Sequence, residues 1–140
     1  AKGIPVIPTC HAAAAALARL GVRRLALVHP PWFPETSNEA GAAYWRAAGF
    51  DVVRSVRMQP DRPFHEVAPA ELHDAVVRNT PSDAEAVFVG GNGLRAVGAI
   101  RALEARLGRP VLTANQVLLW EALRTIGRAA SVTRYGRLFA

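Results

Sequence analysis

The sequence has 140 residues, of which 51% are hydrophobic, so it is long and apolar enough to form one domain with a substantial core. Its single cysteine, Cys10, excludes an internal disulfide framework and a cysteine-based zinc site, which need several sulfur atoms. The net charge of +6 comes from arginines that are scattered among acidic residues, as in the stretch 101–106, and we therefore expect no nucleic-acid partner.

The start of the chain, Ala1-Lys2-Gly3, has no initiator methionine and no charged-then-apolar segment of the kind that directs secretion. Charges or prolines interrupt every apolar run before it reaches the roughly 18 residues that a membrane-spanning helix needs. We therefore expect a cytoplasmic protein with no membrane partner. We also expect the chain to be part of a longer polypeptide.

Short apolar runs alternate with segments of helical spacing along the chain, which predicts an α/β fold with a doubly wound parallel sheet. The predicted strands are residues 25–28, 52–56, 86–89 and 110–113, and residues 4–7 are a candidate fifth strand. The predicted helices are residues 11–20, 38–48, 65–78, 94–107 and 116–126. Several of these helices are followed by a glycine, which is a common stop signal.

The ligand crevice of a doubly wound sheet lies outside the carboxyl ends of the strands. Residues that carry chemistry are therefore expected directly after each strand. Four segments qualify: 8–11, 29–33, 90–93 and 114–116.

The turn Gly90-Gly91-Asn92-Gly93 follows a predicted strand and precedes a predicted helix. Unshielded N–H groups at a helix start form an anion site, so we predict that the backbone of Gly91, Asn92 and Gly93 binds a small carboxylate. A purely structural glycine turn is one alternative. A nucleotide site is another, because residues 91–96 fit G-x-G-x-x-A, although the next strand is not followed by the acidic residue that this fingerprint requires.

Other strand-end residues have a structural and a functional interpretation. Cys10 begins a predicted helix whose dipole would lower the thiol pKa, but no acid-base partner adjoins it except His11, so we interpret it as structural. His29 with Trp32 and Phe33 forms either a wall of the crevice or a rigid loop that fills the core.

The amide of Asn115 either caps the last helix or faces a ligand. No combination of His, Asp and Glu in the sequence has metal-ligand spacing, so we expect no metal site.

Four stretches of the sequence resemble arylmalonate decarboxylase and maleate cis-trans isomerase, which belong to the aspartate/glutamate racemase superfamily. The resemblance covers nearly all of the chain in the same order. The stretches are residues 21–28 (GVRRLALV), 86–94 (AVFVGGNGL), 103–116 (LEARLGRPVLTANQ) and 135–139 (YGRLF).

The resemblance implies two similar α/β lobes with an active site between them and no metal or organic cofactor. This chain matches the second lobe. Residues 1–21 would join the lobes, residues 22–126 would form the lobe itself, and residues 127–140 would be a tail that packs on the first lobe. The first lobe of the same protein is therefore an expected partner, together with a small carboxylic acid.

One departure from the family pattern concerns catalysis. Gly91 stands where the family has its second-lobe cysteine, so this lobe lacks the expected nucleophile or proton donor, and its catalytic residue is unknown. The family's pocket tyrosine has Trp32 or Phe33 as its nearest counterpart here, which removes one hydroxyl donor. The resemblance still implies a cofactor-independent isomerase, racemase or decarboxylase acting on a small mono- or dicarboxylic acid. A non-catalytic carboxylate-binding relative is the alternative.

We also expect homo-oligomers. Without another lobe, residues 29–33 and 135–139 would present aromatic surface to water, and exposed apolar patches of this kind usually find partners.

Overall fold

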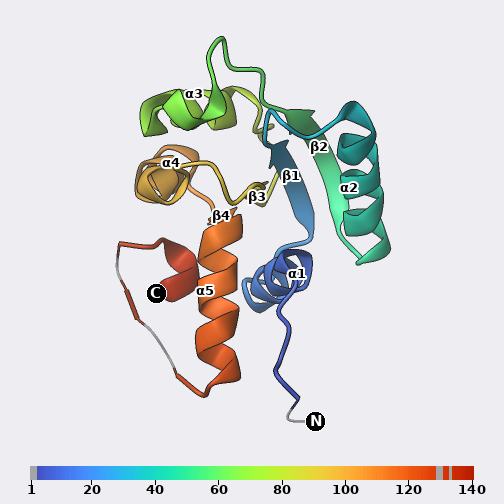
Figure 1. The fold of residues 1–140 in the computed structure, drawn as a ribbon, viewed down its shortest axis with the longest axis vertical. Coiled ribbons are helices and arrows are strands. Elements are labelled where there is room, and N and C mark those ends of the chain that lie inside the picture. The colour runs from blue at the N-terminus through green and yellow to red at the C-terminus, as the bar shows by residue number, and fades with distance from the viewer. Residues whose placement is uncertain (1–2, 129–130, 133) are drawn as a thin grey trace.

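The alternating pattern of the sequence folds into helices and parallel strands in the computed structural model, which describes residues 3–128, 131–132 and 134–140 (Figure 1). The helices are α1 (Thr9–Arg19), α2 (Glu35–Ala47), α3 (Pro69–Arg78), α4 (Ile100–Leu107) and α5 (Ala114–Thr125). The strands are β1 (Arg24–His29), β2 (Asp51–Arg57), β3 (Ala86–Val89) and β4 (Val111–Thr113). Short 3-10 turns cover η1 (Phe64–Glu66), η2 (Val97–Ala99) and η3 (Arg137–Phe139).

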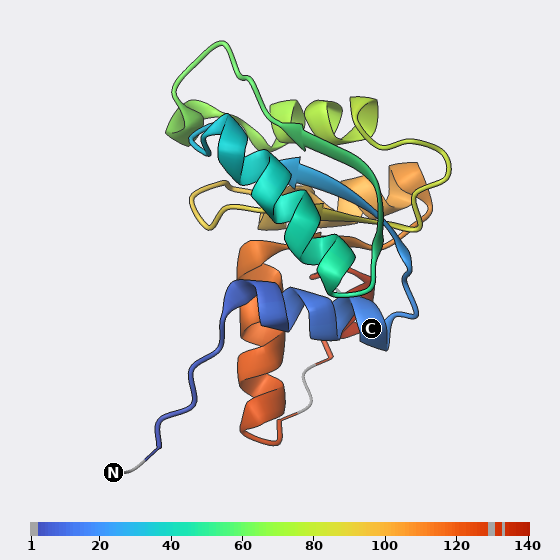
Figure 2. The ribbon, with the colours of Figure 1, turned by 90° about the vertical axis from the view of Figure 1, so that its right-hand side faces the viewer.

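The four strands form one parallel sheet in the order β2-β1-β3-β4. Helices α1, α2 and α5 cover one face, whereas α3 and α4 cover the other (Figures 1 and 2). Because both faces are covered, the central strand β3 is buried along its whole length, which explains its unbroken apolar run. The predicted α/β fold with a doubly wound parallel sheet is confirmed.

Side chains of the strands alternate between two cores, as the pleat of a strand requires. The core under α1, α2 and α5 contains the strand residues Leu25, Leu27, Ala86, Phe88 and Leu112. The core under α3 and α4 contains Ala26, Val28, Val87, Val89 and Val111. The two cores hold the sheet rigid, so that residues directly after the strands are fixed in position.

Two predicted elements differ from the structure. Residues 4–7 form no strand, and Ile4 and Val6 are exposed. The helix predicted for residues 94–107 begins only at Ile100, after the 3-10 turn η2. Leu94 and Ala96 are both buried in the core under α3 and α4, so residues 94–96 pack there before the helix begins.

Residues 134–140 pack against the lobe itself. The buried Glu104 carboxylate on α4 accepts hydrogen bonds from the Arg137 N–H at 2.9 and 3.2 Å and from the Val111 N–H at 3.1 Å. One side chain therefore joins α4, β4 and the end of the chain. The Gln116 amide of α5 adds a hydrogen bond to the Tyr135 carbonyl oxygen.

The expected aromatic surface at residues 135–139 is wrong for Phe139, which is 2% exposed and belongs to the core beside α1 and α5. Tyr135 remains exposed. The packing of residues 127–140 on a first lobe stays a prediction.

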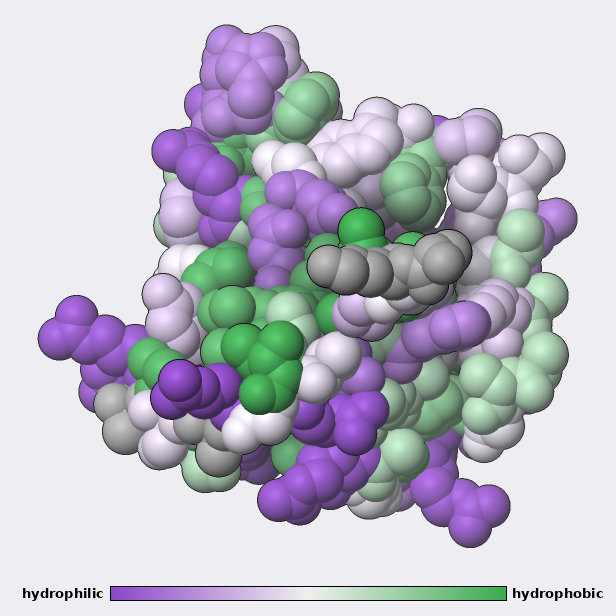
Figure 3. Space-filling view, turned by 60° about the horizontal axis from the view of Figure 1, so that its bottom comes forward, coloured by the Kyte–Doolittle hydropathy of each residue, from purple (hydrophilic) through white to green (hydrophobic). Residues whose placement is uncertain are grey.

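The face that carries the N-terminal segment and the lower end of α5 shows hydrophobic residues lying between hydrophilic ones (Figure 3). Its exposed large hydrophobic side chains include Ile4, Val6 and Ile126. Across the described residues, no helix is both long and apolar enough to cross a membrane.

Candidate functional site

The candidate site lies at the point where the chain reverses its direction across the sheet. After β1 the chain continues to the edge strand β2 and then returns past β1 to β3. The carboxyl ends of β1 and β3 are therefore neighbours, and the connections that leave them run in opposite directions along the sheet. Such switch points hold the ligand crevices of open α/β sheets.

A cavity of about 300 Å³ lies at this point. Its lining comes from the start of α1, the end of β1 and the loop after it, one side of α2, the end of β3 with the turn after it, and the start of α5. The lining residues are Thr9, Cys10, His29, Trp32, Phe33, Ser37, Gly41, Tyr44, Trp45, Phe88, Gly90, Gly91, Asn92 and Ala114.

The turn after β3 places backbone donors at this cavity. Gly90 N–H closes the ladder by donating to the Val28 carbonyl oxygen at 2.9 Å. The next three N–H groups, of Gly91, Asn92 and Gly93, donate to no acceptor within the described part of the chain. The Asn115 side chain of α5 donates to the Asn92 carbonyl oxygen at 3.0 Å and holds the turn in place. Asn115 therefore supports the turn, and Thr113, rather than Asn115, precedes α5 as its N-cap.

The helix start predicted directly after this turn is absent, because residues 92–96 form a turn, a bend and an irregular segment before η2. The dipole of a helix therefore does not reinforce the three N–H groups, and they act as individual donors. The same finding argues against a nucleotide site, since the dinucleotide fingerprint needs its helix to open within the glycine motif.

Gly91 has a conformation that a cysteine would not adopt without rearrangement. Its φ is +89°, and a Cβ built on it would lie 2.8 Å from Pro30 and 2.9 Å from Trp32. The loop after β1 therefore occupies the space that a side chain at position 91 needs. The glycine at this position and the bulky loop residues fit each other.

His29 is 5% exposed and is held by a chain of side-chain hydrogen bonds. Its Nε2 lies 3.1 Å from the Ser55 hydroxyl of β2, which donates to Oδ1 of Asn38 on α2 at 2.7 Å. Burial lowers the pKa of the His29 imidazole. The ring is therefore neutral at pH 7.

The cavity wall is aromatic and uncharged. Trp32 packs on Phe64 of η1 with ring centroids 4.5 Å apart, and Trp45 packs on Phe88. No Lys, Arg, Asp or Glu is found among the described lining residues. A bound carboxylate would thus have uncharged donors only, such as backbone N–H groups and the hydroxyls of Thr9, Ser37 and Tyr44.

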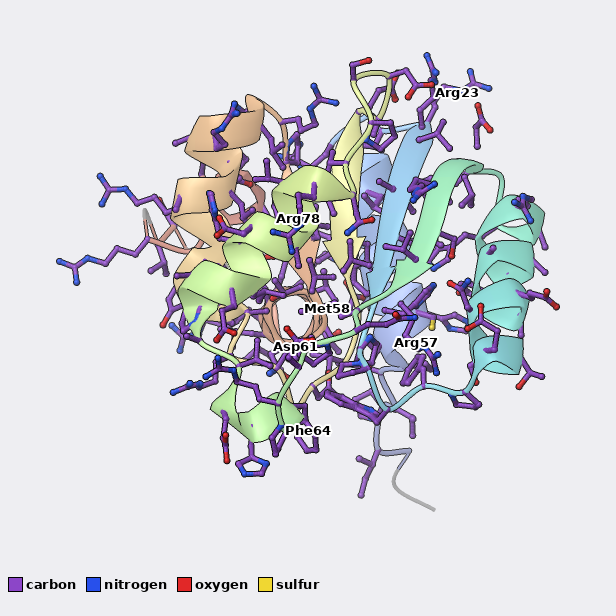
Figure 4. The ribbon with its side chains drawn as sticks, turned by 90° about the horizontal axis from the view of Figure 1, so that it is seen from above. Arg23, Arg57, Met58, Asp61, Phe64 and Arg78 are labelled. Carbon is purple, nitrogen blue, oxygen red and sulfur yellow. The ribbon has the colours of Figure 1, made fainter. Side chains whose placement is uncertain are left out.

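The loop that carries Trp32 and Phe33 is anchored from the edge strand. Arg57 at the end of β2 donates to the Phe33 carbonyl oxygen at 2.9 Å and pairs with Glu35 at 3.4 Å. Figure 4 shows Arg57 on the side of β2 that faces α2, whereas Phe64 lies farther along the loop that follows β2. The loop that carries Trp32 and Phe33 is thus held by β2 through Arg57 and by the segment after β2 through Phe64.

Cys10 lines the cavity at the first turn of α1. We expected the helix start to lower the thiol pKa, but partial burial raises it. Burial also raises the pKa of Tyr44, and the charge of a nearby Cys10 thiolate would raise it further. The environment of Cys10 therefore favours the thiol over the reactive thiolate.

Sequence reasoning placed five of its seven substrate-binding candidates on this cavity: His29, Trp32, Phe33, Gly91 and Asn92. The other two lie at its edge, where Asn115 supports the turn and a Cβ on Gly93 would be 3.2 Å from Trp32. The sequence analysis did not identify Ser55 and Asn38, whose hydrogen bonds hold the His29 ring in place. The glycine inside the predicted second helix, Gly41, was the available signal, because such a glycine often marks a close approach.

The comparisons with known proteins agree with this architecture. The model of the family described as Arylmalonate decarboxylase matches residues 1–139. Arylmalonate decarboxylase of Bordetella bronchiseptica is 31% identical over 144 residues, an alignment that covers 99% of this chain and 59% of the relative. The chain thus spans about 59% of the length of this curated relative.

Solved structures give the same picture. A crystal structure of arylmalonate decarboxylase superposes with a TM-score of 0.82 at 30% identity and covers 94% of this chain and 59% of that one. Maleate isomerase from Pseudomonas putida S16 superposes with a TM-score of 0.87 at 22% identity, covering 96% and 55% of the two chains. The latter similarity concerns the fold alone.

Proposed function

Because this chain belongs to the arylmalonate decarboxylase family, we propose that it forms the carboxylate-binding lobe of a cofactor-independent enzyme that decarboxylates, isomerises or racemises a small mono- or dicarboxylic acid. The observation that carries the proposal is the row of N–H groups of Gly91, Asn92 and Gly93. They have no acceptor within the described residues and lie at the switch point of the sheet.

These donors suit the charge that develops in such reactions. When a bond to the carbon next to a carboxylate breaks, its electron pair spreads onto the carboxylate oxygens as an enediolate. Preorganised N–H groups stabilise that charge without rearranging, and one donor of this kind is typically worth about 3 kcal/mol. The aromatic and uncharged lining strengthens the effect because it keeps water away.

A second candidate is a non-catalytic protein that binds a small carboxylate. The fit between Gly91 and the loop of Pro30 and Trp32 favours it, because that loop leaves no room for the family's cysteine. Both candidates share the backbone site, and they differ only in turnover. If the whole protein is an enzyme, its reactive cysteine comes from outside this lobe.

The backbone site can be tested with Gly93→Val. Its new side chain would press on Trp32, since even a Cβ would be 3.2 Å from the indole, so we expect phenylmalonate and maleate to bind at least about tenfold more weakly. Binding is followed by quenching of tryptophan fluorescence, and Trp32→Phe identifies the reporting residue.

Gly98→Val serves as the matched control, because a Cβ on Gly98 meets only Pro69 at 3.9 Å, away from the cavity. Unchanged carboxylate affinity in Gly93→Val would refute the backbone site. Quenching of the parent by NADH but by neither acid would favour a nucleotide site instead. Decarboxylation or isomerisation by the whole protein would then decide between the enzyme and the binding protein.

A further inference from the structure

We propose that Nδ1 of His29 is the proton acceptor of this cavity and that Ser55 and Asn38 are positioning residues that keep it free of a proton. This inference rests on the proposed function, because it assigns a role within the same site. Three steps lead to it: the tautomer of the ring, the direction of its free nitrogen and the charges around it.

The hydrogen-bond chain determines the tautomer of His29. The Asn38 Oδ1 atom can only accept, so the Ser55 hydroxyl uses its proton in the 2.7 Å bond to Asn38. Its oxygen must then accept at its 3.1 Å contact with His29, which places the ring proton on Nε2. In a neutral imidazole this leaves Nδ1 with a lone pair and no proton.

The free nitrogen lies toward Gly90, at the end of β3. A Cβ built on Gly41 of α2 would meet Cε1, Nε2 and Nδ1 at 3.0, 3.4 and 3.9 Å, so the Cε1–Nε2 edge of the ring is the one closest to α2. Nδ1 is the ring atom nearest to Gly90, which lines the cavity beside the row of backbone donors. Within the described residues, Nδ1 has no hydrogen-bond partner. The side chain is thus more than nine-tenths buried and holds an unpaired acceptor beside Gly90 in the lining of the candidate site.

The charges around the ring also favour the neutral form. Burial lowers the pKa of His29. The titratable groups that face it are Cys10 on α1 and Tyr44 on α2, whose own pKa values burial raises, so both are uncharged at pH 7. On the β2 side, Arg57 pairs with Glu35, which offsets its charge. His29 therefore has no carboxylate partner that would hold it as a cation.

The chemical role follows from this geometry. With the substrate carboxylate on the N–H groups of residues 91–93, the C–H bond next to it breaks. The proton moves to Nδ1, and the electron pair remains on the substrate as the enediolate. The imidazolium then returns the proton to the same carbon, so no further reactant is consumed. A base placed in this way typically contributes a factor of about 100 to 10,000.

The tautomer is measured by ¹⁵N NMR of the histidine ring in the 140-residue chain at neutral pH. We expect an unprotonated Nδ1 and a protonated Nε2. In Asn38→Ala the Ser55 hydroxyl loses its acceptor and is free to donate to Nε2, so the Nδ1-protonated form should rise. Asn38→Asp keeps an acceptor and should restore the parent spectrum. Asn79→Ala, which removes an amide of equal size on the far side of the sheet, should change nothing. A parent ring that carries its proton on Nδ1 overturns the inference.

Proton transfer is measured as exchange of the α-proton of phenylmalonate in D₂O, above the rate without protein. We expect His29→Gln to slow the protein-dependent exchange about 100-fold or more, with phenylmalonate binding retained. The parent rate should fall as the pH falls through the pKa of His29. Asn38→Ala and Asn38→Asp should both move that midpoint, and Asn38→Asp should raise it, because its carboxylate favours the imidazolium. Retained binding with exchange that is absent in the parent, or unaltered by His29→Gln, overturns this inference and leaves the proposed function standing. Absence of binding to the parent refutes both.

Discussion

At the scale of single residues, Cys10 is the side chain whose chemistry the fold suppresses. Burial raises its pKa, which disfavours the reactive thiolate. We expect Cys10→Ser to leave carboxylate binding and the turnover of the whole protein largely intact. Alkylation of Cys10 by iodoacetamide should show a pH midpoint above about 8.5, the value of an unperturbed thiol. Loss of turnover by several orders of magnitude with unchanged folding would show that Cys10 is the nucleophile.

Single residues also show why part of the site escaped prediction. His29 and Gly91 follow directly from the rule that ligands meet the carboxyl ends of strands. Ser55 does not, because it reaches His29 across the sheet, and its position depends on the register of β1 against β2. That register shifts between Leu25 and Ala26, an irregularity that no spacing in the sequence indicates.

At the scale of elements, the four strands were predicted to within one residue at each end, whereas the candidate strand at residues 4–7 is absent. Helical spacing likewise located α1, α2, α3 and α5. The segment before α4 failed for a physical reason: its residues are helix-compatible, yet the burial of Leu94 and Ala96 in one core outweighs the weak local preference. Local sequence preferences thus determine which segments become helices or strands, whereas tertiary packing determines the residue at which α4 begins.

The junction of α4, β4 and the last residues gives a prediction at this scale. Replacing Glu104 with Ala leaves the N–H groups of Val111 and Arg137 without an acceptor, so we expect a loss of about 2–4 kcal/mol in the free energy of unfolding. Urea denaturation measures it. The control is Glu71→Ala on α3, which removes a carboxylate that accepts the Ala68 N–H and forms an exposed ion pair with Arg62, and should cost about 1 kcal/mol. Equal losses in the two variants would contradict the role assigned to Glu104.

At the scale of the whole molecule, the chain spans 59% of the curated relative that it matches, and several of its large hydrophobic side chains are exposed. Phe139 is buried, but Ile4, Val6, Trp32 and Leu119 are exposed. We expect the 140-residue chain to self-associate and to perform no net decarboxylation or isomerisation alone. Sedimentation velocity over a concentration series measures the association. Removal of residues 1–7 should reduce it, because Ile4 and Val6 are the most exposed large hydrophobic side chains.

A strictly monomeric chain at high concentration would contradict this expectation. Net turnover of a dicarboxylate by the 140-residue chain would contradict the expectation that it performs no net decarboxylation or isomerisation alone.

Because Gly41 lies close to the His29 ring, the effect of a substitution at either position depends on the residue at the other. Alanine in place of a helical glycine usually stabilises by about 1 kcal/mol, but here its methyl group would sit 3.0 Å from an imidazole that Ser55 holds in place. We expect Gly41→Ala to destabilise the parent and to stabilise the His29→Ala background, a reversal of sign that a double-mutant cycle of unfolding free energies would measure. Additive effects would show that the ring yields freely. If the reversal holds, alanine is tolerated at position 41 only when residue 29 has no ring. In a protein with alanine at position 41, restoring histidine at position 29 would then be destabilising unless position 41 is first changed back to glycine.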